Sequence, residues 1–255
     1  MRRPFVAANW KMHGTASFVE AYLEDWRKTG PRGVVDVVIC PPLAYLDRVA
    51  AAWGDHGVQF GVQAVHAEPS GAYTGEHAAE MARDLGATYA IVGHSERRQL
   101  FAESDAVVAA KFVAARRAGL MPVLCVGETL AERRAGGAEA KVLAQLDGVL
   151  GRPGAKALDA DFVVAYEPVW AIGTGETATP TQAQRMHGTI RARLGEVGDA
   201  FAQSVRIVYG GSVNVDNAEA LFTQTDIDGG LVGGASLDAA AFAAICRVAG
   251  RRTDS

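Results

Sequence analysis

The sequence contains few cysteines and no motif that pairs them. Its three cysteines, Cys40, Cys125 and Cys246, are odd in number and far apart, and no CxxC pair occurs among the 255 residues. Disulfide frameworks and structural zinc sites both need cysteines at close, paired spacings. The pattern therefore argues against both kinds of site and favours a reducing compartment.

The chain also lacks an excess of basic charge and any long apolar run. It carries 25 Lys and Arg against 29 Asp and Glu, a formal net charge of −4, which argues against nucleic acid or an anionic membrane as a partner. Arg2 and Arg3 are similar to the start of a signal peptide, but the apolar run after them stops at Asn9. No run approaches the length that crosses a bilayer. We therefore expect a cytoplasmic protein.

Short apolar runs rich in Val and Ile alternate with longer amphipathic segments. Nearly continuous apolar runs are typical of parallel strands that are covered on both faces. The predicted strands are 4–10, 34–40, 58–64, 88–93, 120–127, 161–167, 205–210 and 227–234. The predicted helices are 15–28, 43–53, 76–85, 104–118, 129–150, 181–194, 215–222 and 238–248. Ser104 and Thr181 are the predicted N-caps, and Gly86 and Gly119 the predicted helix ends.

Eight strands, each followed by a helix, predict an α/β fold. A chain of this length fits one closed (β/α)8 barrel spanning residues 1–255. An open, doubly wound sheet is the main alternative. Its nucleotide-binding fingerprint is nearly matched by Gly173, Gly175 and Ala178, but five residues separate this segment from its strand. Because the fingerprint requires a tight strand-to-helix turn, we interpret the match as chance.

In a barrel, catalytic groups lie at the C-terminal ends of the strands. The residues that follow the predicted strands there are Asn9, Lys11, Gln63, His94, Ser95, Glu96, Arg97, Glu128, Glu167, Gly210, Gly211, Ser212, Gly233, Gly234 and Ser236. Strand order alone therefore brings a carboxylate, an imidazole, a cation and two glycine-rich segments to one rim.

Three of these side chains have both a catalytic and an ordinary interpretation. Glu167 ends an apolar strand and precedes Pro168; it is either a general base or a solvated or arginine-paired carboxylate. His94 lies between a buried strand and a predicted helix start, where the positive potential disfavours an imidazolium. It is either a neutral hydrogen-bond donor or an ordinary surface or satisfied histidine. Lys11 is either a surface lysine, a Schiff-base amine or a fixed cation for an anionic substrate.

Two glycine pairs and one long loop also stand out. Gly210-Gly211 and Gly233-Gly234 follow the last two strands; they are either tight turns or the backbone phosphate site that recurs at this place in barrels. Residues 66–77 form a long polar loop, which suits a subunit contact, a lid or an idle surface loop.

Together these motifs resemble the triosephosphate isomerase family over essentially the whole chain. The matching segments are NWKM (9–12), GAYTGE (71–76), VGHSERR (92–98), CVGE (125–128), AYEPVWAIGTG (165–175), YGGSV (209–213) and LVGGASL (231–237). The resemblance implies interconversion of dihydroxyacetone phosphate and D-glyceraldehyde 3-phosphate, a step of glycolysis and gluconeogenesis, without metal or cofactor. It also implies a homodimer and a small phosphorylated sugar as substrate.

The resemblance further implies roles for individual residues. Glu167 matches the base, His94 the neutral electrophile, Lys11 the charge-balancing cation and Asn9 a donor to the same oxygen region; this family is itself a standard example of tuned pKa values and of a closing loop. The remaining matches are Ser95 and Glu96 as supporting residues, Gly173, Ser212, Gly233 and Gly234 as phosphate contacts, Pro168, Trp170, Glu176 and Ala178 within the lid at 168–178, Tyr209 on the latching loop and Thr74 as the residue that enters the partner.

Three positions depart from the family pattern. Ala64 stands where asparagine is common, which puts in doubt the rigidity of the loop supporting Lys11. Glu176 inverts the charge usual at the lid's C-terminal hinge, and Gly230 is smaller than usual, a change expected to loosen strand eight. Three other functions remain open at this point: isomerisation of a longer ketose phosphate, Schiff-base aldol chemistry at Lys11, and sugar-phosphate binding without catalysis.

Overall fold

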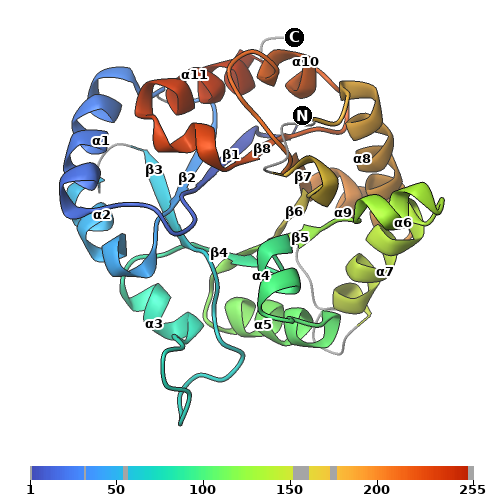
Figure 1. Ribbon diagram of the computed structural model, residues 1–255, viewed down its shortest axis with the longest axis horizontal. Coiled ribbons are helices and arrows are strands. Elements are labelled where there is room, and N and C mark those ends of the chain that lie inside the picture. The colour runs from blue at the N-terminus through green and yellow to red at the C-terminus, as the bar shows by residue number, and fades with distance from the viewer. Residues whose placement is uncertain (1, 32, 54–56, 152–160, 173–176, 252–255) are drawn as a thin grey trace.

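Eight parallel strands close into a barrel in chain order, which confirms the predicted (β/α)8 fold. The computed structural model describes residues 2–31, 33–53, 57–151, 161–172 and 177–251. Helices surround the strands as a ring (Figure 1). The strands are β1 (Phe5–Asn9), β2 (Asp36–Cys40), β3 (Val58–Val62), β4 (Tyr89–Val92), β5 (Met121–Val126), β6 (Val163–Tyr166), β7 (Arg206–Tyr209) and β8 (Gly229–Val232).

The helical layer contains more segments than the predicted one helix after each strand. The α-helices are α1 (Ala16–Thr29), α2 (Leu46–Trp53), α3 (Ala79–Asp84), α4 (Ser95–Leu100), α5 (Asp105–Arg117), α6 (Leu130–Arg134), α7 (Ala138–Leu150), α8 (Pro180–Gly195), α9 (Asp199–Ser204), α10 (Ala218–Phe222) and α11 (Ala239–Gly250). Short 3₁₀ turns are η1 (Leu43–Tyr45), η3 (Val169–Ala171) and η4 (Gly234–Leu237).

Two helix predictions were wrong in their details. The predicted helix 129–150 is interrupted between α6 and α7, because Gly136 adopts the left-handed φ of +76°. The predicted cap Thr181 lies inside α8. The cap is Thr179, whose hydroxyl accepts from Gln182 N at 3.2 Å while Gln182 Oε1 accepts from Thr179 N at 3.0 Å, a reciprocal capping box with Pro180 in the first turn.

Other helix boundaries agree with the sequence pattern or start later. Ser104 caps α5 by accepting from Val107 N, and Gly86 and Gly119 follow α3 and α5 with positive φ, as predicted. The helix predicted to start at residue 215 begins only at Ala218. Its first turn is replaced by an Asx turn, in which Asn214 Oδ1 accepts from the two amides at 216 and 217.

Side chains alternate between two buried layers, which explains why the strands read as continuous apolar runs. In β1, Phe5 and Ala7 point into the barrel interior, whereas Val6 and Ala8 pack under the helices. Strand eight was expected to be loose at Gly230, but the space beside this glycine is filled. A Cβ there would lie 3.1 Å from Phe222 Cζ, so the Phe222 ring packs strand eight in place of a larger side chain.

The barrel closes where β1 pairs with β8, and a buried carboxylate ties the seam. Asp228, just before β8, accepts from Arg2 Nε at 2.8 Å, from Arg191 Nη2 at 2.6 Å and from Ile207 N at 2.9 Å. Its burial is therefore compensated by two cations and an amide. Among the described helices, none combines the length and hydropathy that a membrane span requires.

Candidate active site

Glu167 follows β6, and its position is set by the neighbouring strands. Its N–H donates to Val126 O at 2.8 Å. A Cβ added to Gly127 would lie 1.7 Å from the Glu167 carbonyl oxygen, and one added to Gly210 would lie 2.9 Å from Glu167 Cγ. Glycines on both flanking strands therefore let the backbone approach the base closely.

The Glu167 carboxylate is almost fully buried, with 1% of the residue exposed, yet only half satisfied. Oε2 accepts from Ser95 N at 2.8 Å. Oε1 lies 3.0 Å from His94 Nε2, but no partner within the described ranges meets it in hydrogen-bond geometry. The two groups therefore face each other without a well-directed hydrogen bond. The carboxylate is therefore held by one backbone N–H and by the weak donor of the buried Cys125 thiol, so its desolvation is only partly compensated.

His94 caps α4 with its own ring. Glu96 N lies 3.3 Å from His94 Nδ1, and since a backbone N–H can only donate, Nδ1 is the acceptor. In the neutral imidazole the proton then lies on Nε2, the nitrogen that faces Glu167. The contact fixes the tautomer of a neutral ring, and the role of His94 as a neutral donor stays a prediction.

Lys11 is held in a strained conformation by its neighbours. It is a non-glycine residue with φ of +51°, a region that side chains disfavour. Its N–H donates to Asn9 Oδ1 at 3.1 Å, and its carbonyl accepts from Gln63 Nε2 at 2.8 Å. Its Nζ lies 2.5 Å from Glu96 Oε1. That ion pair suits a fixed ammonium, whereas a Schiff base requires the neutral amine.

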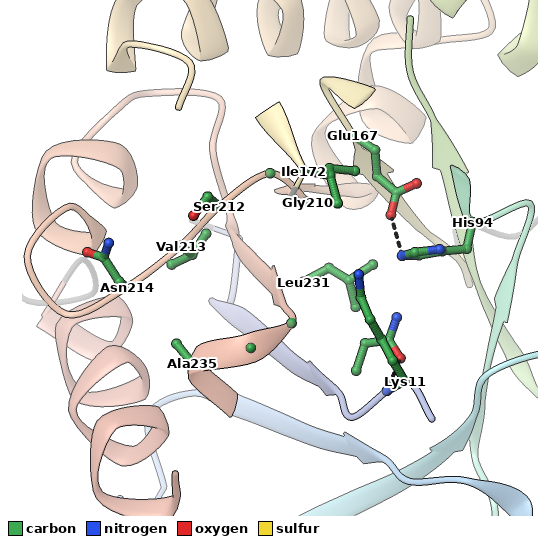
Figure 2. Close-up of a pocket in the computed structure, with 14 residues that line it drawn as sticks. Lys11, His94, Glu167, Ile172, Gly210, Ser212, Val213, Asn214, Leu231 and Ala235 are labelled. Atoms are coloured by element: carbon green, nitrogen blue, oxygen red, sulfur yellow. Dashed lines mark hydrogen bonds and ion pairs between the residues drawn. The ribbon is translucent and has the colours of Figure 1, made fainter. Parts of the chain in front are cut away.

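These side chains share one cavity of about 310 Å³ with the glycine-rich loops (Figure 2). Glu167 and His94 lie on one side, and the 212–214 segment lies on the opposite side. The lining residues are Asn9, Lys11, His94, Glu167, Ile172, Gly210, Gly211, Ser212, Val213, Asn214, Leu231, Gly233, Gly234 and Ala235. The structure thus brings together a carboxylate, a neutral donor, a cation and loops able to present backbone N–H groups to an anion.

The segment after Glu167 is anchored to Glu128, a buried residue that sequence order placed on the rim without a role. Val169 N donates to Glu128 O at 3.1 Å. Glu128 Oε1 accepts from Trp170 Nε1 at 2.8 Å, Tyr166 Oη at 3.1 Å and Arg133 Nη1 at 3.0 Å. These contacts hold the first turn after Pro168 down on β5, before Gly173.

The far end of the predicted lid reaches β7. Burial raises the pKa of Tyr209 to about 12, against an opposing contribution from the nearby backbone N–H of Ala178. The Ala178 side chain is itself buried. Gly173 and Glu176, the predicted phosphate contact and hinge residue, lie outside the described residues.

Thr74, the residue predicted to enter the partner, does not line this cavity. It is exposed on the 66–77 loop, which projects from the ring of helices beside α3 (Figure 1). Conversely, Ile172, Val213, Asn214 and Leu231 line the cavity without having been predicted. The matching motifs contain Ile172, Val213 and Leu231, but apolar residues in a buried pattern carry no signal of which ones border a cavity. Asn214 lies just outside the motif at 209–213. Within the described ranges, no group of three or more His, Cys, Asp or Glu side chains is placed to hold a metal ion.

Comparison with known proteins identifies the family of the chain. The family model described as "Triosephosphate isomerase" matches residues 4–249. The chain belongs to the triosephosphate isomerase family. A curated "Triosephosphate isomerase" of Stenotrophomonas maltophilia (strain K279a) is 54% identical over 249 residues, covering 98% of this chain and 99% of that protein. Those of Dechloromonas aromatica (strain RCB) and Xanthomonas campestris pv. campestris (strain 8004) are each 53% identical over 98% of this chain, covering 100% and 99% of those proteins.

Membership of the triosephosphate isomerase family accounts for the full length of the chain, because the matched relatives and this sequence cover one another almost completely.

Proposed function

We propose that this member of the triosephosphate isomerase family interconverts dihydroxyacetone phosphate and D-glyceraldehyde 3-phosphate with Glu167 as the base. The observation that carries the proposal is the pair formed by the Glu167 carboxylate and His94 Nε2, 3.0 Å apart on the wall of a cavity that Lys11 also lines. The carboxylate takes the proton from the carbon beside the carbonyl, and the electron pair moves onto the carbonyl oxygen. Return of the proton to the neighbouring carbon gives the isomer.

The surrounding groups suit the charge that develops on the oxygens. His94 Nε2–H and the Nδ2 end of Asn9 are donors facing the enediolate, and the Lys11 ammonium balances its charge together with that of the phosphate. The Ser212, Gly233 and Gly234 segments present backbone N–H groups to the phosphate. Ser95 positions Glu167 through its N–H, and Glu96 positions Lys11.

The weak hold on Glu167 favours this role. To reach substrate, Oε2 must leave Ser95 N, which exchanges one hydrogen bond at a cost of about 1–3 kcal/mol. We propose that the lid predicted at 168–178 covers the cavity when substrate is bound and that Glu128 anchors its first turn at Val169 and Trp170. An apolar cover replaces water around the carboxylate, and exclusion of water increases its basicity.

An assay that couples glyceraldehyde 3-phosphate turnover to a dehydrogenase tests the proposal. We expect turnover by the pure protein and a loss of several decades in kcat for Glu167→Gln, with Glu24→Gln, an exposed glutamate of α1, as the matched control. A Glu167→Gln variant with nearly unchanged kcat refutes the base assignment. Higher kcat/KM on four-carbon ketose phosphates points to a longer substrate, and tight binding of a phosphoglycolate analogue without turnover points to a binding protein.

We also propose that the chain acts as a homodimer in the cytoplasm. Its acidic net charge and its three buried free cysteines support the cytoplasmic location. Met12 and Phe101 are 94% and 64% exposed and line a cavity of about 190 Å³ that Lys11 also lines, and Leu100, next to Phe101 in the chain, is 75% exposed. An exposed apolar patch of this kind favours a protein contact. The Thr74 loop of a second copy is the proposed occupant. Light scattering at micromolar concentration should give twice the chain mass, and Phe101→Lys should reduce it; a monomeric unmodified protein contradicts the proposal.

A further inference from the structure

The two ends of the 66–77 loop are tied together by His77. Its Nε2 lies 2.6 Å from Ala64 O, and its carbonyl accepts from His66 N at 2.8 Å. Since a carbonyl oxygen only accepts, Nε2 carries the proton of the ring. The contact therefore joins the exit of the loop to the segment that enters it directly after β3.

The residue beside Ala64 holds Lys11. Gln63 Nε2 donates to Lys11 O at 2.8 Å and to Cys40 O at 3.0 Å. Lys11 needs this support, because its φ of +51° is strained for a side-chain-bearing residue. A shift of the 63–64 backbone would move the Gln63 amide away from the Lys11 carbonyl. The position of Ala64 therefore bears directly on the Lys11 backbone.

At Ala64 itself, only the backbone can be held, because a methyl side chain makes no hydrogen bond. The His77 ring is half-buried and faces Glu76 of its own loop, Arg97 of α4 and Lys111 of α5. Burial, aided by the two cations, lowers the pKa of His77. The ring is thus a neutral donor near pH 7. At position 64, where this chain has alanine in place of the usual asparagine, the ring bonds the backbone carbonyl.

We infer that His77 is a positioning residue for Lys11, acting through the Ala64 carbonyl and the Gln63 amide. The inference rests on the proposed role of Lys11 in holding the substrate phosphate. Loss of the clamp lets the 63–64 segment relax, displaces the Lys11 ammonium and weakens substrate binding more than it slows turnover.

The test compares His77→Ala and His77→Gln with His66→Ala. Gln retains an N–H donor that can reach the carbonyl. His66 lies in the same loop, but its ring accepts from Glu68 N and packs on Tyr73, whereas the His77 ring bonds Ala64 O. We expect His77→Ala to raise KM and the inhibition constant of inorganic phosphate together, about 3- to 10-fold, the effect of one hydrogen bond. The kcat should change less than about twofold, Gln should restore both constants, and His66→Ala should alter neither.

Three results overturn the inference: an unchanged KM in His77→Ala, no rescue by Gln, or an equal effect of His66→Ala. Light scattering at the assay concentration shows whether His77→Ala keeps the oligomeric state of the native protein. A KM defect that disappears as the protein concentration rises reflects loss of a dimer and also contradicts the inference. Lys11→Met is assayed in parallel. If that variant keeps normal kinetics, the proposed role of Lys11 fails; if it loses activity while His77→Ala is normal, only the clamp fails.

Discussion

The buried histidine of α8 makes stability depend on pH in a direction that the structure fixes. His187 has 0% of its surface exposed, and its ring packs near Tyr166 and Tyr209, with centroids 5.8 and 6.4 Å away. Nδ1 lies 3.1 Å from Asp226 O, while Nε2 has no hydrogen-bond partner within the described ranges. Burial lowers the pKa of His187 from 6.5 to about 4, although the Asp226 carbonyl opposes the shift.

The sign of the effect follows from proton linkage. Between pH 6.5 and about 4 the unfolded chain binds a proton at this position and the folded chain does not, so the free energy of unfolding falls as the pH falls. Above pH 6.5 both states are neutral and the contribution is constant. The full shift corresponds to about 3 kcal/mol, of which about 2 kcal/mol is lost by pH 5.

Urea denaturation of the native protein and His187→Asn at pH 7.5 and pH 5 measures this quantity. Asn keeps a donor for the Asp226 carbonyl and cannot titrate. We expect the stability difference between the two proteins to shift by about 2 kcal/mol in favour of the variant at pH 5. His13→Asn, at an exposed histidine, is the matched control and should show no such shift. All samples need one protein concentration, because oligomer stability depends on it. A difference that is equal at both pH values refutes the reasoning.

Three further changes test the site and its scaffold. Gly210→Ala places a methyl 2.9 Å from Glu167 Cγ, so kcat should fall at least about tenfold with normal circular dichroism; unchanged kcat contradicts the close approach. Thr179→Ala should cost about 1 kcal/mol in urea denaturation and Thr181→Ala about half that or less, and the reverse order contradicts the observed cap. Glu128→Ala removes the acceptor for the buried Tyr166 hydroxyl and for two part-buried donors and should cost about 1–3 kcal/mol, with Glu128→Gln losing less; equal losses in both variants contradict the hydrogen-bond account.

The fold and the rim were predictable because they depend on local period and strand order. Continuous apolar runs identify covered parallel strands, and parallel strands send their C-terminal ends to one side. Strand order thus predicted that four side chains lie together at one rim, although it gave no distances between them. These residues are Asn9, Lys11, His94 and Glu167. The cap of α8 was also encoded, since Thr179 and Gln182 have capping-box spacing, but the pattern of Pro180 followed by Thr181 drew attention to a position two residues too late.

Other parts of the site depend on contacts that have no sequence period. Glu128 meets Trp170 across 42 residues, and Ser95 N meets Glu167 across 72. The requirement for glycine at 127 arises only from how closely β5 approaches the Glu167 carbonyl. Each of these facts requires the relative placement of two strands or loops to within a fraction of an ångström, which residue type and spacing do not determine.

The seam between β1 and β8 has a consequence for synthesis of the chain. Arg2 meets Asp228 across 226 residues, and β1 gains its second neighbour only when β8 is available. At about 5–20 residues per second, β1 emerges from a ribosome on the order of tens of seconds before its last partner. During that interval a row of backbone donors and acceptors is open to other chains, which is the condition that leads to aggregation. The nascent barrel is therefore a natural client for chaperones until its final strand arrives.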